Sequence, residues 1–352
     1  MSEEKELTRG EQLRRALVYE RKNGWDRLDA EEGAALEAYC TGYKQFLDAG
    51  KTERECVDRA IAQAEAAGFR AYVRGMELKP GDRIYQVNRD KAIMLAVMGQ
   101  KGLEHGVNIG AAHIDSPRLD LKQNPLYESD ELGFFKTHYY GGIRKYQWVT
   151  IPLELHGVVA LKNGEVVRVS VGNGPDDPMF TIDDLLPHLA TDQVKKPLGE
   201  AIPAESLNIL VGSRPLRDDE GSDRVKLSVL ELLNRKYGIV EEDFLSAELC
   251  AVPAFRAVDI GFDRSLIGAY GHDDRVCAYA SLAALLQLGT PERTAVCMLA
   301  DKEEIGSEGV SGMKSRAFDT FMEDLCQSQS VPLRACYEKS FCLSADVTAA
   351  YD

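Results

Sequence analysis

The pattern of secondary-structure signals changes twice along this 352-residue chain. Helix-like periodicity alternates with strand-like apolar runs in residues 1–119, and the same alternation returns in residues 251–352. Between them, residues 120–250 carry short β patterns punctuated by Pro and Gly, including a hairpin signal at Asn163-Gly164. This order predicts an α/β domain of residues 1–119 and 251–352, with a β-rich domain of residues 120–250 inserted into it.

Apolar periodicity and capping signals place the individual elements. In the α/β parts we expect helices at 31–48, 52–68, 276–288 and 315–325, and strands at 84–87, 92–98, 107–113, 294–300 and 341–346. In the β-rich block we expect strands at 148–155, 157–161 and 166–171, and a helix at 225–237. The helix near residue 52 begins with a capping box formed by Thr52 and Glu55.

The composition narrows the classes of partner. The formal net charge is −15, whereas nucleic acids and anionic membranes attract basic surfaces. No apolar run approaches the roughly 20 residues that span a bilayer, and the charged residues 1–6 lack the apolar core of a signal peptide. The eight cysteines are scattered without a Cys-x-x-Cys pair, which is typical of reduced thiols. We therefore expect a cytoplasmic protein that binds neither nucleic acid nor membrane.

Two adjacent glutamates, Glu303 and Glu304, follow the expected strand at 294–300 and precede a glycine. Neighbouring side chains on a strand point to opposite faces, so the pair can share a site only if the strand ends and the backbone turns there. One carboxylate could then bind a metal while the other handles a proton. The alternative is a solvated pair at a strand end, and the pair taken alone favours that alternative.

Histidine is rare in this chain, with six residues, and His113 ends the expected strand at 107–113. Asp115 lies two positions further on, where it can orient the imidazole as the carboxylate partner of a metal-bound histidine does. A buried structural histidine beside an Asp-Ser-Pro turn is the alternative, and for an isolated histidine it would be the favoured one.

Further carboxylates occur at two places near expected element ends. Asp273 and Asp274 stand between His272 and Arg275, just before the helix at 276–288, and Asp346 ends the last apolar segment. Aspartates at a helix N-terminus also cap exposed N–H groups, and Asp346 could be an ordinary loop carboxylate. Two aspartates flanked by a histidine and an arginine exceed what a cap needs.

Taken together, these positions share the strand and loop ends of an α/β framework, where the sites of open α/β sheets lie. One imidazole with several carboxylates suits zinc or a related divalent ion. The carboxylates outnumber the ligands of one zinc, and a two-metal centre, with ions roughly 3.5–4 Å apart, would use them. The chain has no His-Glu-x-x-His, Gly-x-Ser-x-Gly or phosphate-loop motif.

Four motifs, in order and spacing, resemble those of the M18 family of aminopeptidases. They are His-Ile-Asp-Ser-Pro-Arg at 113–118, Gly-His-Asp-Asp-Arg at 271–275, Asp-Lys-Glu-Glu-Ile-Gly-Ser at 301–307 and Ser-Ala-Asp at 344–346. The resemblance runs from near residue 10 to the end. It implies a zinc-exopeptidase α/β sandwich domain with an inserted β-rich domain for dimerisation and substrate binding, hydrolysis of the N-terminal residue of short peptides, and a homo-oligomer, typically a dodecamer.

The resemblance also implies roles for single residues. His113 and Asp346 would bind one zinc ion, Asp273 would bridge two ions, and Glu304 would bind the second. Glu303 would be the general base, and Asp115 would assist at the catalytic site. His188, in the β-rich block, would lie near the substrate. Manganese or cobalt could replace zinc in such a site.

One departure from the family pattern concerns the second metal. In the family the last ligand is a histidine near the C-terminus, but no histidine of this chain follows His272. We expect a complete first site, an incomplete second one, and a chain that is C-terminally truncated or has lost full competence. Two alternatives to the aminopeptidase stay open: a non-catalytic M18-like assembly protein and a dinuclear zinc deacylase.

Overall fold

The computed structural model describes residues 7–218 and 220–349, and the chain divides into two compact units, residues 1–43 and 44–352. In the first unit, α1 (Arg9–Leu17) begins with a capping box in which Thr8 and Glu11 satisfy each other's backbone N–H groups. A 3₁₀ turn follows at Trp25–Arg27, and α2 (Ala30–Ala49) continues from the first unit into the second.

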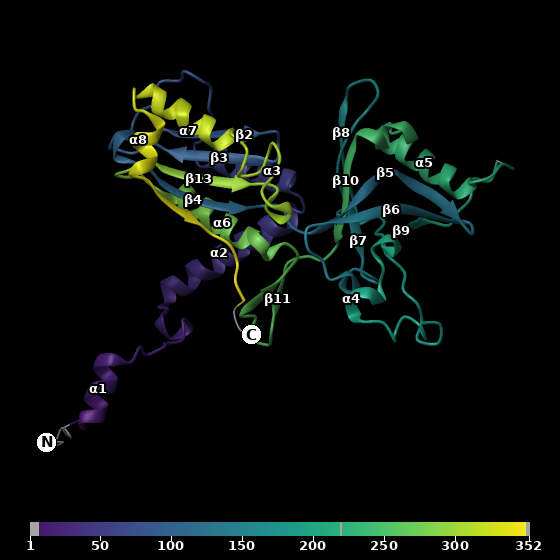
Figure 1. The fold of residues 1–352 in the computed structure, drawn as a ribbon, viewed down its shortest axis with the longest axis horizontal. Coiled ribbons are helices and arrows are strands. Elements are labelled where there is room, and N and C mark those ends of the chain that lie inside the picture. Colours follow the sequence, from purple (N-terminus) through teal and green to yellow (C-terminus); the bar gives the residue numbers. More distant parts are fainter. Residues whose placement is uncertain (1–6, 219, 350–352) are drawn as a thin grey trace. The chain divides into compact units, whose positions relative to one another are not determined.

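The second unit contains a six-stranded mixed sheet in the order β1-β2-β3-β13-β4-β14 (Figure 1). Its strands are β1 (Arg70–Ala71), β2 (Arg83–Asn88), β3 (Ala92–Val97), β13 (Ala295–Ala300), β4 (Asn108–His113) and β14 (Phe341–Ser344). β13, β4 and β14 run parallel to one another. Their carboxyl ends therefore meet at one edge of the sheet, which is where a binding site is expected.

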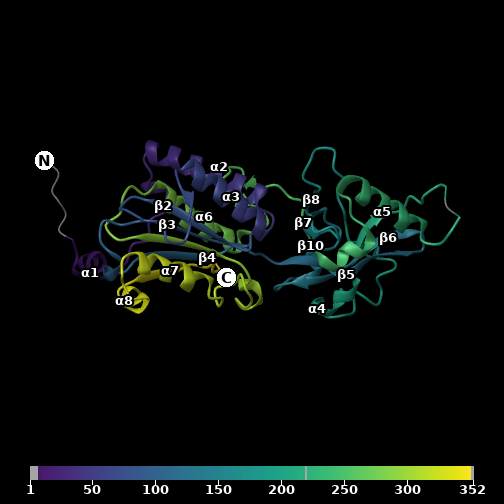
Figure 2. The same cartoon turned by 90° about the horizontal axis from the view of Figure 1, so that it is seen from above.

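Helices cover both faces of this sheet, because its central strands are apolar on both sides. Figure 2 shows α3 (Glu53–Ala66) on one side of the strands and α7 (Ala317–Ser328) and α8 (Leu333–Glu338) on the other. α6 (His272–Gln287) packs against β4, β13 and α3. Alternate residues of the strands, including Met94, Ala96 and Met298, form the core with α7. The result is a helix–sheet–helix sandwich.

A second six-stranded sheet is antiparallel throughout, in the order β8-β7-β10-β5-β6-β9. Its strands are β5 (Arg118–Ser129), β6 (Leu132–Tyr140), β7 (Leu153–Ala160), β8 (Val166–Val171), β9 (Ile209–Gly212) and β10 (Ala247–Pro253). α5 (Arg224–Tyr237) packs on this sheet around a core that includes Phe135, Leu155 and Phe244. A small hairpin, β11 (Val258–Ile260) and β12 (Leu266–Gly268), follows β10.

Short elements complete the described chain: α4 (Leu198–Ala201) and 3₁₀ turns at Leu103–His105, Lys145–Gln147, Ala204–Ser206, Glu241–Ser246 and Glu303–Ile305. The predicted α/β fold class is confirmed. The predicted boundaries of the inserted domain stay a prediction; the second sheet draws its strands from Arg118 to Pro253. Within residues 7–218 and 220–349, no helix is long and apolar enough to cross a membrane.

The prediction of two strands at 148–155 and 157–161 was wrong. One strand, β7 (Leu153–Ala160), replaces them, and Trp148 lies just after a 3₁₀ turn. Gly157 stays inside the strand with φ +140°, and a Cβ there would lie 1.9 Å from the carbonyl oxygen of Glu248 on β10. The glycine therefore permits a close approach of two strands, and it does not end one.

Candidate metal centre

The carboxyl edge of the first sheet brings the sequence-predicted residues together. His113 is the last residue of β4, Asp346 lies two residues after β14, and Asp273 lies in the first turn of α6. One ligand atom from each of these three side chains can be chosen so that all lie within 4.8 Å of one another. The described part of the chain thus holds a three-residue group with the spacing of a metal site.

His113 provides the centre of the group. Its Nε2 atom lies 3.2 Å from Oδ1 of Asp273, 3.7 Å from Oε2 of Glu303 and 4.0 Å from Oδ1 of Asp346. The imidazole is buried, whereas the three carboxylates are about half exposed, at 56, 47 and 53% of their side-chain surface. Nε2 is therefore the ring nitrogen available to bind a metal ion, and the three carboxylates surround it on the side that is open to solvent.

The Glu303-Glu304 pair converges on this place because the strand before it ends. β13 stops at Ala300, and Lys302 adopts a left-handed conformation with φ 72°. The chain then enters the 3₁₀ turn Glu303–Ile305. The alternation of a strand no longer applies there, so both carboxylates can face the same side.

Asp115 holds both His113 and the turn that carries Glu303 and Glu304 in place. It is fully buried, and its carboxylate accepts hydrogen bonds from the backbone N–H groups of Glu303 and Glu304, each at 3.2 Å. Nδ1 of His113 lies 2.9 Å from the backbone oxygen of Asp115 and 3.3 Å from its Oδ1. Nδ1 therefore carries the proton, which leaves the lone pair of neutral His113 on Nε2.

Opposed effects set the protonation of these two groups. Burial works against a charged His113, but the Asp115 carboxylate outweighs it and raises the pKa of the imidazole to about 9. Burial likewise works against a charged Asp115, but hydrogen bonds from His113 and Tyr140 lower the pKa of its carboxyl. The Asp115 carboxylate is therefore ionised and fixes the imidazole.

Glu304 lies beside the three-residue group without belonging to it. Its carboxylate packs against Gly141, where a Cβ would come within 2.8 Å of Oε2. Burial and the neighbouring carboxylates of Asp273 and Asp115 raise the pKa of Glu304 to about 7. Burial and the neighbouring acids therefore both disfavour an ionised Glu304.

The donor set fits a divalent cation. Imidazole nitrogen and carboxylate oxygen are the ligands that zinc takes in catalytic sites. Asp115 orients His113 through its backbone oxygen, 2.9 Å from Nδ1, and through its carboxylate Oδ1, 3.3 Å from Nδ1, as the partner of a ligating histidine does. A cation among these groups would also relieve the repulsion that raises the pKa of Glu304.

Comparison with known proteins shows which family the chain belongs to. The family model described as "Aminopeptidase I zinc metalloprotease (M18)" matches residues 46–352. The chain belongs to the M18 family. A probable M18 family aminopeptidase 1 of Clostridium acetobutylicum is 47% identical over 344 residues, which cover 96% of this chain and 74% of that protein.

Solved structures show the same fold. The crystal structure of an M18 aminopeptidase from Thermotoga maritima superposes with a TM-score of 0.89 at 42% identity, covering 95% of this chain and 74% of that one. A yeast mApe1 dodecamer superposes with a TM-score of 0.72 at 20% identity, covering 90% of this chain and 73% of that one, which supports the fold alone.

Membership of the M18 family confirms the expected aminopeptidase, a hydrolase of a zinc metalloprotease family. The number of ions and the roles of single residues stay predictions. His188 lies in an exposed turn, and among the described residues no hydrogen bond or ion pair joins it to His113 or its neighbours. Its predicted place near the substrate remains a prediction.

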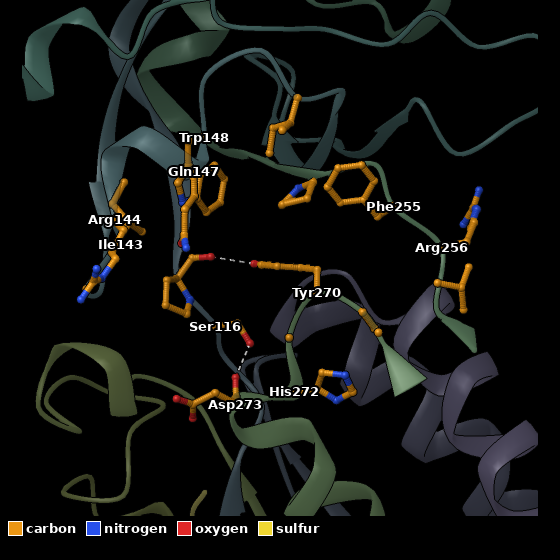
Figure 3. Close-up of a pocket in the computed structure, with 18 of the residues that line it drawn as sticks. Ser116, Ile143, Arg144, Gln147, Trp148, Phe255, Arg256, Tyr270, His272 and Asp273 are labelled. Atoms are coloured by element: carbon orange, nitrogen blue, oxygen red, sulfur yellow. Dashed lines mark hydrogen bonds between the residues drawn. The ribbon is translucent and has the colours of Figure 1, made fainter. Parts of the chain in front are cut away.

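The sequence analysis did not predict the residues that hold the backbone and side chains of the M18 site in place. Ser116 donates a hydrogen bond to the backbone oxygen of Asp273 at 2.7 Å (Figure 3). Arg275 is buried and donates to the backbone oxygens of Ile114 and Lys51, each at 3.1 Å. Ser116 and Arg275 stand inside the quoted motifs, so their closeness in sequence to His113 and Asp273 could have indicated a role at the site. Tyr140, which donates to Asp115 at 2.6 Å, stands outside every motif.

A large pocket opens beside Asp273 in this M18 protein. Its volume is about 850 Å³, and the aromatic side chains of Trp148, Phe255 and Tyr270 are among those that line it (Figure 3). Tyr270 is held by a 2.9 Å hydrogen bond to the backbone oxygen of Pro117. A pocket of this size and lining is of the kind that takes small organic or peptide ligands.

Proposed function

We propose that this M18 aminopeptidase hydrolyses the N-terminal residue of short peptides at a zinc centre held by His113, Asp273 and Asp346. The convergence of their three ligand atoms within 4.8 Å carries the proposal. We further propose that the family's second ion would be held by Asp273 and Glu304. The half-exposed Asp273 and the raised pKa of Glu304 support this second position.

In this proposal the side chains divide the work. Bound zinc would polarise the scissile carbonyl and make a water more acidic. The Glu303 carboxylate, beside His113, takes the proton of the attacking water and passes it to the leaving amine, a role worth about 10²–10⁴-fold in rate. Asp115 fixes His113 and the backbone of Glu303 throughout.

We propose that the substrate peptide enters along the pocket beside Asp273. The pocket adjoins the metal centre through Asp273, and its aromatic lining suits peptide side chains. We also propose that His188 lies near the substrate and that residues 120–250 form a separate inserted domain. The protein would be cytoplasmic and would form a homo-oligomer, such as the dodecamer of the yeast relative. The support for these proposals is the family resemblance.

The test combines metal analysis with an aminoacyl-naphthylamide assay on this chain. We expect bound zinc and zinc-dependent release of naphthylamine. The variant Glu303→Gln should keep its zinc and lose turnover, whereas Glu308→Gln, an exposed glutamate nearby, should keep both. Turnover retained by Glu303→Gln would remove Glu303 from the mechanism. Hydrolysis of acyl amides in place of peptide substrates would favour a deacylase, and zinc binding without any turnover would favour a non-catalytic assembly protein.

A further inference from the structure

We propose that Tyr140, at the end of β6, is a positioning residue for the zinc centre that acts through Asp115. The inference rests on the proposed function, because it concerns how His113 and Glu303 are held for that reaction. Tyr140 donates a 2.6 Å hydrogen bond to Oδ2 of Asp115. Through this hydrogen bond, the second sheet contacts the residue that orients His113 in the proposed zinc centre.

Asp115 has few other ways to satisfy this oxygen. Oδ1 accepts from the N–H of Glu303 at 3.2 Å and lies 3.3 Å from Nδ1 of His113. Oδ2 accepts from Tyr140 and, at 3.2 Å, from the N–H of Glu304. Because Asp115 is fully buried, bulk water cannot replace the tyrosine hydroxyl directly. Loss of that hydroxyl would leave the carboxylate held by the N–H groups of Glu303 and Glu304 and by His113, with one donor fewer to fix its rotation.

Tyr140 is itself firmly placed. It is buried, and its backbone pairs with Arg118 where β5 meets β6. The Arg118 guanidinium lies over the tyrosine ring, 4.1 Å from its centroid. Ion pairs with Asp120 at 2.7 Å and Glu53 at 2.9 Å hold the guanidinium in turn. A ring clamped in this way presents its hydroxyl in one direction, which a positioning residue must do.

Gly141, the residue just after β6, contacts Glu304. Its φ is +70°, and a Cβ at this position would lie 2.8 Å from Oε2 and 3.1 Å from Cβ of Glu304. Glu304 therefore occupies the space that a side chain at 141 would need. Two consecutive residues at the β6 end thus shape the centre, one through Asp115 and the other by contact with Glu304.

The main test is Tyr140→Phe, with Tyr139→Phe as its matched control, since Tyr139 is 44% exposed. We expect Tyr140→Phe to lower kcat by about 10–100-fold and to weaken zinc binding by a similar factor, as loss of a partner behind a metal ligand does. KM should change little, whereas the melting temperature of the zinc-free protein should fall, because the buried Asp115 carboxylate loses a hydrogen-bond donor. Unchanged kcat and zinc affinity, measured by competition with a chromophoric chelator, would overturn the inference.

A second pair of variants tests the other contact of this segment with the centre, that of Gly141 with Glu304. Gly141→Ala places a methyl group against Glu304, whereas Gly164→Ala carries the same positive-φ strain in a turn with no neighbour within 4 Å. We expect at least a tenfold greater loss of kcat for Gly141→Ala. Equal activity of the two would overturn the part of the inference that assigns the contact between Gly141 and Glu304 to the centre. Absence of zinc-dependent turnover in the unmodified chain would instead refute the proposed function, before any variant is compared.

Discussion

Two sets of carboxylates lie close together in this protein and behave in opposite ways. The rim carboxylates, Asp273, Glu303 and Asp346, are about half exposed and face one imidazole nitrogen. The floor carboxylates are Glu53, Asp115 and Asp301, and all three are buried.

Each floor carboxylate has a partner supplied by the fold. Arg118 donates to Glu53 at 2.9 Å, Tyr140 to Asp115 at 2.6 Å, and Ser311 to Asp301 at 2.6 Å. Buried charges need such partners, because their desolvation is costly. The rim carboxylates share His113 and remain open to solvent. The partners satisfy Glu53 and Asp115, whereas Oδ1 of Asp301 has no hydrogen-bond partner among the described residues, and burial raises the pKa of Asp301 to about 6. The exposed charges of the rim are the ones available to a cation.

The largest expected effect is on the floor, at Asp115. The Asp115 carboxylate accepts from, or lies near, four donors, and the Asp115→Asn variant would place an amide NH₂ group against at least one of them. Breaking a buried charged pair costs about 3–5 kcal/mol, and we expect the free energy of unfolding of the zinc-free protein to fall by that order. Urea unfolding measures it, and a loss below about 1 kcal/mol would contradict the buried network described here.

Zinc should act on the rim in the opposite direction. A ligand at 100 times its Kd stabilises the folded state by about 2.7 kcal/mol, so zinc should raise the melting temperature and a chelator should reverse the effect. Asp273→Asn should abolish most of this shift, because Asp273 is common to both proposed ion positions. An equal zinc-induced shift in wild type and Asp273→Asn would show that zinc binds elsewhere.

A buried histidine away from the rim offers a pH test of the same comparison. His156 is fully buried, with Nδ1 2.7 Å from Glu55 and Nε2 3.6 Å from Glu154, and Lys51 lies 3.3 Å from Glu154. Burial opposes its charge, but the two glutamates raise the pKa of His156 to about 9.

The sign follows from the raised pKa of His156. Its stabilising effect is fully present below the unfolded-state pKa of about 6.5 and is lost as the pH rises through about 9. We expect the free energy of unfolding to fall by about 1–3 kcal/mol over this interval. His156→Gln should reduce the dependence without removing it, because the pKa of His113 is also raised to about 9. An unchanged slope in that variant would assign the dependence to other groups.

The smallest effect is expected at the rim without metal. Asp346→Asn removes a charge that is 53% exposed and close to other carboxylates. Surface changes of this kind usually stay within about 0.5 kcal/mol, and relief of repulsion makes a slight gain in stability the expected sign. Urea unfolding of Asp346→Asn and Asp115→Asn measures both effects. A marked loss of stability in Asp346→Asn would contradict the proposed difference between rim and floor carboxylates.

Much of this could be predicted from local signals in the sequence. The helix capped by Thr52, the helix at Arg224–Tyr237 and the apolar strands follow from periodicity and capping, which depend on residues a few positions apart. His113, Glu303 and Asp346 stand at or just beyond strand ends in the sequence itself. The strand at 148–155 failed because the close approach of β7 and β10 at Gly157 is not a local property.

The sequence by itself thus determined the α/β class and the residue types of the centre, through short-range periodicity and the motifs of the M18 family. Only the tertiary structure decided which carboxylates are open and which are buried. It also placed Tyr140 beneath Asp115 and Gly141 against Glu304. These facts depend on strand pairings between distant segments, and a pairing register is specified by packing of the whole sheet rather than by neighbouring residues.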